Sequence, residues 1–120
     1  CLESIYRQEL AEDVFEVIIV NDASTDDSML VVSHMMNVHP NISVITNNES
    51  FGPSVSRNVG MDNAISDYVL FIDSDDMLMD KGLSVLLHKA IDTNADMIVA
   101  DYVRLKDEEI GYNAILTANE

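Results

Sequence analysis

Three carboxylates crowd into four residues of this sequence, at Asp73, Asp75 and Asp76, directly after an apolar run. Like charges so close together repel one another, and a bound cation would keep them ionised in a folded site. Hard divalent cations such as Mg²⁺ and Mn²⁺ take oxygen ligands, often one or two carboxylates plus the phosphates of a substrate. In an extended segment Asp73 and Asp75 would point to the same side. The spacing predicts a divalent-cation site, and a solvated acidic turn is the alternative.

Two further side chains could join this acidic cluster. Asp22 stands at the end of the apolar run 15–20, where a carboxylate could accept a hydrogen bond from a ribose hydroxyl or a base N–H. Arg57 lies near the start of a predicted helix, and its guanidinium could pair with a phosphate or with the acidic cluster. A surface arginine is the alternative for Arg57. Residues 24–28 have the composition of a turn followed by a helix N-cap, and a role in the ligand site is the alternative for this segment.

These residues depend on a regular alternation of strands and helices for their positions. The apolar patterns predict strands near 15–20, 42–46, 68–73 and 96–101. They also predict helices over 2–10 and 28–38, a third helix that begins at 53, and a fourth helix for which Asp80 is the predicted N-cap. Such an alternation predicts an α/β fold with a mostly parallel sheet flanked by helices. Sheets of this kind hold ligands outside the carboxyl ends of their strands. We therefore expect Asp22, Arg57, Asp73 and Asp75 to converge in one cleft there.

Length and charge exclude several classes of protein. The 120 residues suffice for one domain, and the net charge of -16, from 22 acidic and 6 basic residues, argues against binding nucleic acid or anionic membranes. Hydrophobic residues make up 48%, too many for a disordered acidic tail, yet no apolar run is long enough to cross a bilayer. The single cysteine, Cys1, permits no internal disulfide, which favours a reducing compartment. Because the chain opens on Cys1 rather than Met, we expect it to be a piece of a longer protein.

Three segments resemble, in order and spacing, motifs of the family 2 inverting glycosyltransferases, which have the GT-A fold. They read EVIIVNDASTDDS, NNESFGPSVSRNVGMDNA and DYVLFIDSDDML, and the resemblance covers roughly residues 1–103. Asn21, Ala23 and Ser56 depart from the residues usual in the family. The resemblance implies that this single partial domain is the donor nucleotide-sugar-binding half of a catalytic domain, truncated at both ends. The family's first strand and the catalytic base would then lie outside this chain, which would be inactive alone.

The resemblance also implies roles for individual residues. Asp22 would contact the nucleotide base or ribose, Arg57 would lie near the base or phosphates, and Asp73 would lie near the ribose or donor sugar. Asp75 would bind the metal on the diphosphate, Mn²⁺ or Mg²⁺, with Asp76 close by. The donor would be a nucleotide-diphosphate sugar, expected to be a UDP-sugar. The acceptor would be a glycan or a lipid-linked hydroxyl in bacterial polysaccharide or cell-surface glycan synthesis, in the cytoplasm or at the cytoplasmic face of a membrane.

Two other interpretations remain open at this stage. A phosphoacceptor receiver domain would use Asp73 as its phosphorylation site, with Asp22 as a second acidic strand end, but it needs a lysine after a later strand. A non-catalytic module of the glycosyltransferase fold would keep the motifs as relics. If the absent first strand lies centrally, the sheet has a gap between the strands at 15–20 and 68–73. The piece would then be marginally stable or completed by another chain, for example in a homo-oligomer.

Overall fold

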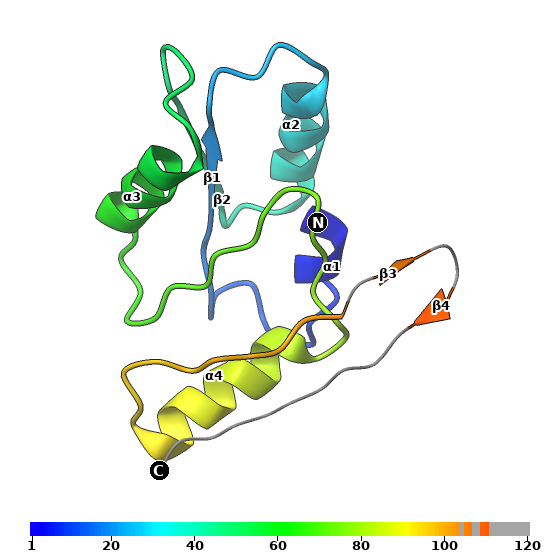
Figure 1. Ribbon diagram of the computed structural model, residues 1–120, viewed down its shortest axis with the longest axis vertical. Coiled ribbons are helices and arrows are strands. Elements are labelled where there is room, and N and C mark those ends of the chain that lie inside the picture. The colour runs from blue at the N-terminus through cyan, green and yellow to red at the C-terminus, as the bar shows by residue number, and fades with distance from the viewer. Residues whose placement is uncertain (104, 107–108, 111–120) are drawn as a thin grey trace.

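The computed structural model describes residues 1–103, 105–106 and 109–110 and has the predicted α/β architecture (Figure 1). Its elements, in chain order, are α1 (Leu2–Ile5), β1 (Val17–Asn21), α2 (Ser28–Val38), β2 (Ile42–Thr46), α3 (Pro53–Asn63), α4 (Gly82–Thr93), β3 (Leu105–Lys106) and β4 (Glu109–Ile110). Strands β1 and β2 pair in parallel, and β3 and β4 pair antiparallel. The parallel pair is the part of the fold that positions the candidate site.

Helices cover both faces of the parallel pair. Helix α3 packs against β1 and α2 against β2, and Figure 1 shows these two helices on opposite faces. The β-branched runs of β1 and β2 suit such a layer, because a parallel strand is apolar on both sides. Ile42 in β2 and Val32 in α2 are 6% and 8% exposed, and they form part of the core. In α3, Gly60 lies so close to β1 that a Cβ there would come within 3.6 Å of Val20 Cγ2.

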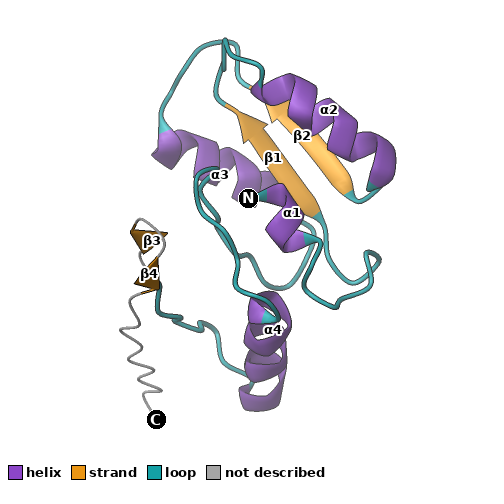
Figure 2. Ribbon diagram, turned by 90° about the vertical axis from the view of Figure 1, so that its right-hand side faces the viewer, coloured by secondary structure: helices purple, strands orange, loops and turns teal. Residues whose placement is uncertain are grey.

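The predicted strands near 68–73 and 96–101 do not form, and this part of the prediction was wrong. Both segments run as irregular loops (Figure 2). A strand requires a hydrogen-bonded neighbour, and within the described part of the chain residues 68–72 make no backbone–backbone hydrogen bond. The side chains of Val69, Leu70 and Phe71 are 45–47% exposed. The apolar pattern that produces β1 and β2 therefore produces no ladder where no partner strand is available.

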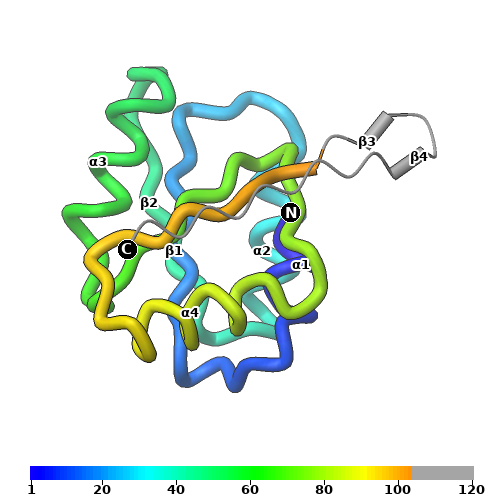
Figure 3. The backbone as a smooth tube through the Cα atoms, turned by 60° about the horizontal axis from the view of Figure 1, so that its bottom comes forward, coloured from blue at the N-terminus to red at the C-terminus, as the bar shows by residue number. Residues whose placement is uncertain are grey.

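Two predicted helices begin or end elsewhere. The helix predicted over 2–10 ends at Ile5, and Glu9 has a positive φ of 56°, which is incompatible with a continuing helix. Helix α4 begins at Gly82, and Asp80 does not cap it, because the N-cap position is occupied by Lys81 with a left-handed φ of 64°. Helix α4 lies beyond the layers formed by α2 and α3, at the front of the molecule in Figure 3. No helix among the described residues has the length and apolar character needed to cross a membrane.

Side-chain contacts hold the amino-terminal edge of the parallel pair together. The ring of Tyr6 stacks on that of His39, with centroids 3.5 Å apart and an interplanar angle of 13°, and its O–H donates to Asn41 Oδ1 at 2.9 Å. Asn41 Nδ2 donates to the carbonyl oxygen of Phe15 at 3.0 Å, and His39 Nδ1 lies 2.7 Å from Glu12 Oε1. Burial and the nearby Glu12 charge raise the pKa of Tyr6 to about 12. These contacts fasten the loop before β1 to the start of β2.

Candidate functional site

Asp22 follows β1 and holds the loop of residues 47–52. Its carboxylate accepts four hydrogen bonds from that loop, from Asn47 Nδ2 at 2.7 Å, Ser50 Oγ at 2.8 Å, Phe51 N–H at 3.0 Å and Gly52 N–H at 2.8 Å. The bond from the Phe51 N–H, with the other three, holds the pKa of Asp22 well below its ordinary value. A carboxylate offers about four lone-pair sites, so the loop uses essentially its whole accepting capacity.

The residues after Asp22 form a turn that leads into α2. Asn21 is 9% exposed, and its Oδ1 accepts the Ser24 N–H at 2.9 Å. Asp26 Oδ1 accepts the Ser28 N–H at 3.0 Å at the start of α2. The side-chain hydrogen bond of Ser28, followed by this backbone bond, lowers the pKa of Asp26. The side chain of Asn21 thus stabilises the turn. Within residues 24–28 these polar groups carry out turn and helix-start chemistry, which was one of the two expectations for this segment.

Arg57 pairs with the acidic cluster. Its Nη2 donates to Asp73 Oδ1 at 2.7 Å, and the two side chains are 42% and 56% exposed. Helix α3 brings the guanidinium there because Gly52 forms its N-cap, with φ 85° and ψ 171°, and Pro53 occupies the first turn. An ion pair this exposed contributes little to stability. The Arg57–Asp73 pair instead fixes a position, because it joins the start of α3 to the segment that follows residue 72.

Asp75 and Asp76 present their carboxylates to solvent in the acidic turn, which we define as residues 73–76. The Asp76 N–H donates to the Asp73 carbonyl oxygen at 3.0 Å, which closes the turn. Over residues 1–103 the side chains of Asp75 and Asp76 are exposed and make no hydrogen bond or ion pair. The described residues contain no group of three or more His, Cys, Asp or Glu side chains that could hold a metal by themselves. Two free carboxylates fit a Mg²⁺ or Mn²⁺ ion that completes its shell with phosphate oxygens and water.

The predicted site residues are linked through one continuous set of contacts. Asp22 binds Gly52 at the N-cap of α3, and Arg57 of the same helix binds Asp73, two residues before Asp75. Arg57 and Asp73 therefore meet as expected. Asp22 reaches them only through the 47–52 loop, since no direct contact joins it to either among the described residues. Figure 1 shows this loop at the same end of the molecule as the carboxyl end of β1.

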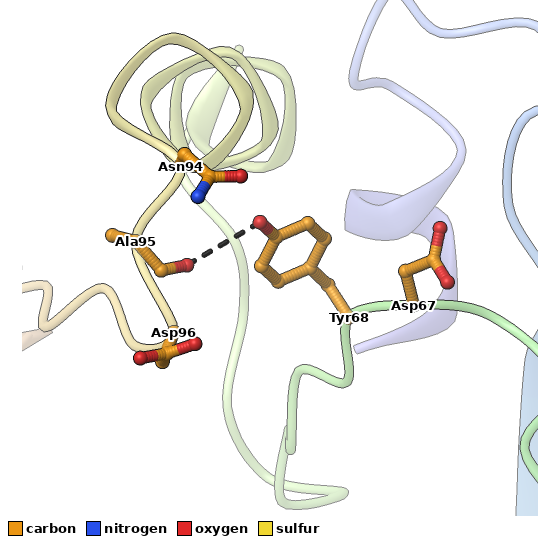
Figure 4. Close-up of a pocket in the computed structure, with 5 residues that line it drawn as sticks. All are labelled: Asp67, Tyr68, Asn94, Ala95 and Asp96. Carbon is orange, nitrogen blue, oxygen red and sulfur yellow. Dashed lines mark hydrogen bonds between the residues drawn. The ribbon is translucent and has the colours of Figure 1, made fainter.

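A shallow hollow lies apart from these contacts (Figure 4). It has a volume of about 350 Å³ and is lined by Asp67, Tyr68, Asn94, Ala95 and Asp96. The Tyr68 O–H donates to the Ala95 carbonyl oxygen at 3.3 Å, which joins the segment after α3 to the turn after α4. None of the predicted site residues lines this hollow.

Sequence reasoning missed the partners of the predicted residues. Asn47 and Ser50 are short polar residues before Gly52–Pro53, and their place in front of a helix start was the available signal. Ser4 and Gln8, which bond to the segment after the acidic turn, sit among apolar residues at helical spacing. Nothing in a single sequence distinguishes them from ordinary helix-surface residues.

The chain is similar in sequence to known proteins. The profile described as glycosyl transferase family 2 matches residues 1–117. Glycosyltransferase GlyA of Streptococcus pneumoniae serotype 4 is 33% identical over 109 residues, which are 91% of this chain and 15% of GlyA. The GalNAc(5)-diNAcBac-PP-undecaprenol beta-1,3-glucosyltransferase of Campylobacter jejuni is 34% identical over 90 residues, 74% of this chain and 28% of that protein.

A solved structure has the same fold. It is the mannosyltransferase PcManGT from Pyrobaculum calidifontis, in complex with GDP-Man and Mn²⁺, and it matches with a TM-score of 0.67 and 27% sequence identity. The match covers 82% of this chain and 28% of that one, so the chain spans well under half the length of each of these relatives. The predicted family resemblance and fold class are confirmed, and the receiver interpretation is disfavoured.

Proposed function

Because the chain belongs to glycosyl transferase family 2, we propose that it forms the donor nucleotide-sugar-binding part of an inverting glycosyltransferase. In the proposed reaction a sugar passes from a UDP-sugar to a hydroxyl of a glycan or lipid-linked acceptor, in polysaccharide or cell-surface glycan synthesis. The Mn²⁺ and GDP-Man of the mannosyltransferase support a metal-bound nucleotide donor, and the name of the Campylobacter relative supports a lipid-linked acceptor. We place the reaction in the cytoplasm or at the cytoplasmic face of a membrane, since Cys1 can form no internal disulfide.

The observation that carries this proposal is the Arg57–Asp73 pair next to Asp75 and Asp76, two carboxylates without a partner in the described part of the chain. When a sugar leaves its nucleotide, negative charge develops on the diphosphate, and a divalent cation stabilises that charge. Asp75 and Asp76 would hold the cation, which a chain with a net charge of -16 needs in order to attract a diphosphate. Arg57 supplies a guanidinium at the same place, where a phosphate can replace Asp73 as its partner. Asp73 would then be free to accept from the ribose or donor sugar.

Asp22 takes part in this proposal mainly through the 47–52 loop. Its four hydrogen bonds hold that loop in front of α3, and a nucleotide base or ribose could reach the carboxylate only by displacing one of the donors. The hydroxyl of Ser50 is the donor most easily exchanged, because it is exposed and rotates freely. We therefore propose that Asp22 orders the loop in the free protein and accepts from the nucleotide in the complex.

The test is a calorimetric titration of the full-length protein with UDP, and with GDP in parallel, in Mn²⁺ and in excess EDTA. Asp75→Asn keeps the shape of the side chain but removes a charged ligand, so it is expected to lose most metal-dependent binding and most sugar transfer while folding normally. Asp92→Asn, an exposed aspartate in α4, is the matched control and should bind as the parent does. Equal binding in EDTA, or phosphoryl transfer to Asp73 from a small phosphodonor, would contradict the proposal.

A further inference from the structure

Two fully buried polar side chains lie next to the segment that leaves the acidic turn. Ser4 in α1 and Gln8, just after it, are each 1% exposed, and they are the most deeply buried side chains of the described residues. Burying an amide or a hydroxyl costs free energy unless it is hydrogen-bonded. The hydrogen-bond partners of Ser4 and Gln8 therefore show which backbone groups these buried side chains hold in place.

The amide of Gln8 satisfies three backbone groups at once. Its Nε2 donates to the carbonyl oxygens of Ser4 at 2.8 Å and Met79 at 2.9 Å, and its Oε1 accepts the Leu83 N–H at 2.8 Å. Two acceptors on one side and one donor on the other allow only this orientation of the amide. Leu83 lies in the first turn of α4, whose N-cap residue, Lys81, makes no side-chain capping bond. Gln8 thus caps α4 from another part of the chain.

Ser4 adds a further fixed point on the same segment. Its Oγ accepts the Leu78 N–H at 3.0 Å and donates to the Cys1 carbonyl oxygen at 2.6 Å. Together with the bonds of Gln8, residues 78–83 are held at three backbone positions, beginning two residues after Asp76. On its other side the acidic turn is held by the Arg57–Asp73 pair. In the free protein the turn is therefore held at both ends, while Asp75 and Asp76 have no hydrogen-bond or ion-pair partner within residues 1–103.

We propose that Gln8 is a positioning residue for the metal-binding carboxylates, an inference that rests on the proposed function. By fixing the Met79 carbonyl and the Leu83 N–H, it sets the path of the chain that leaves the acidic turn. That path determines where Asp75 and Asp76 stand relative to Arg57. Gln8 touches neither the metal nor the nucleotide, so its effect must pass through the backbone of residues 76–83.

The experiment compares Gln8→Leu with Val32→Ala in the full-length protein. Leucine is similar in size but leaves the Met79 carbonyl and the Leu83 N–H unsatisfied. Val32→Ala weakens the core in α2, where Val32 is 8% exposed, without touching the acidic turn. Gln8→Leu should lower Mn²⁺-dependent UDP affinity by about 10-fold. This is the lower end of the loss seen when a residue hydrogen-bonded to a metal ligand is removed, because Gln8 acts through the backbone. Its UDP affinity in EDTA, and both affinities of Val32→Ala, should match the parent.

Hydrogen exchange provides a second measurement that does not depend on ligand. Amides of residues 76–83 should exchange faster in Gln8→Leu and at the parent rate in Val32→Ala. If Gln8→Leu does not fold, Ser4→Ala is used instead. It removes the anchor for the Leu78 N–H together with the bond to the Cys1 carbonyl oxygen, leaves the bonds of Gln8 in place, and should show the same pattern with a smaller loss.

Unchanged metal-dependent affinity in Gln8→Leu, or an equal loss in EDTA, would overturn the positioning role. A parent protein with no metal-dependent binding would refute the proposed function instead. Amide hydrogen exchange in Gln8→Leu would then be the remaining test of the anchoring by Gln8. Faster exchange of residues 76–83 would support this anchoring, and unchanged exchange would refute it.

Discussion

Replacing Gly52 by alanine should uncouple the 47–52 loop from α3. Gly52 forms the N-cap of α3 with φ 85° and ψ 171°, a backbone region that is essentially restricted to glycine. Its N–H also donates to Asp22 at 2.8 Å. A Cβ at this position would meet no atom within 4 Å, so the whole penalty of the substitution comes from the backbone conformation.

The structure gives the size of this effect and a matched control. Holding a non-glycine residue in such a region costs about 1–3 kcal/mol. Gly60 lies inside α3 with an ordinary conformation, and a Cβ there would sit 3.6 Å from Val20 Cγ2, an ordinary van der Waals contact. Gly60→Ala should therefore stabilise the helix by about 0.5–1 kcal/mol. The two alanine substitutions are expected to differ by at least about 1.5 kcal/mol, or roughly tenfold in the unfolding constant.

The assay is urea denaturation of the full-length protein carrying each substitution, combined with UDP titration in Mn²⁺. Gly52→Ala should lower the free energy of unfolding and weaken nucleotide binding, because relaxation of the loop breaks the bond to Asp22 and shifts the start of α3. The double variant Gly52→Ala/Asp22→Asn should lose less free energy of unfolding than the two single variants lose together, since both substitutions act on the same loop. A Gly52→Ala protein as stable as Gly60→Ala would refute this reasoning.

Two further predictions concern acid and concentration. The pKa of Asp22 is lowered in the folded state, so its contribution to stability is fully present above its unfolded pKa of about 4 and is lost as the pH falls toward the folded value. The amides of Phe51 and Gly52, corrected for intrinsic rate, should exchange faster near pH 3 than near pH 5, and Asp22→Asn should abolish this difference. The isolated 120-residue chain should melt at a temperature that rises with protein concentration in circular dichroism, because residues 68–72 form no backbone–backbone hydrogen bond with any other described residue. A cooperative, concentration-independent melt at high temperature would contradict that expectation.

Secondary structure could be predicted wherever the two segments that interact lie close together in the sequence. The run 42–46 becomes β2 because the run 17–21 lies within reach across one helix and pairs with it residue by residue. The run 68–73 has the same β-branched and aromatic character but forms no strand. Side-chain pattern reports burial and conformational preference, whereas a ladder also needs a neighbour, which no pattern within the run can reveal.

The candidate site was predictable in its residue types but not in its partners. A carboxylate after a strand and an arginine near a helix start were enough to single out Asp22 and Arg57, and the pairing of Arg57 with Asp73 is one of the outcomes that this pattern left open. The four donors to Asp22 come from a loop that local rules treat only as a connection. Asp80 was expected to cap α4 because capping rules consider adjacent residues. The group that does so belongs to Gln8, which lies far away in the sequence.

The contacts of Ser4 and Gln8 also determine the order in which the site can assemble. They join residues 71, 74 and 75 positions apart, whereas the partners of Asp22 lie only 25–30 positions away. During synthesis, at about 5–20 residues per second, β1, α2, β2 and the 47–52 loop can therefore form about 1.5 to 6 seconds before Leu83 is available. The acidic turn takes its final place last, after the longest loops have closed. A nascent chain that stalls before residue 78 would hold the Asp22 loop without any of the three bonds that fix the exit from the acidic turn.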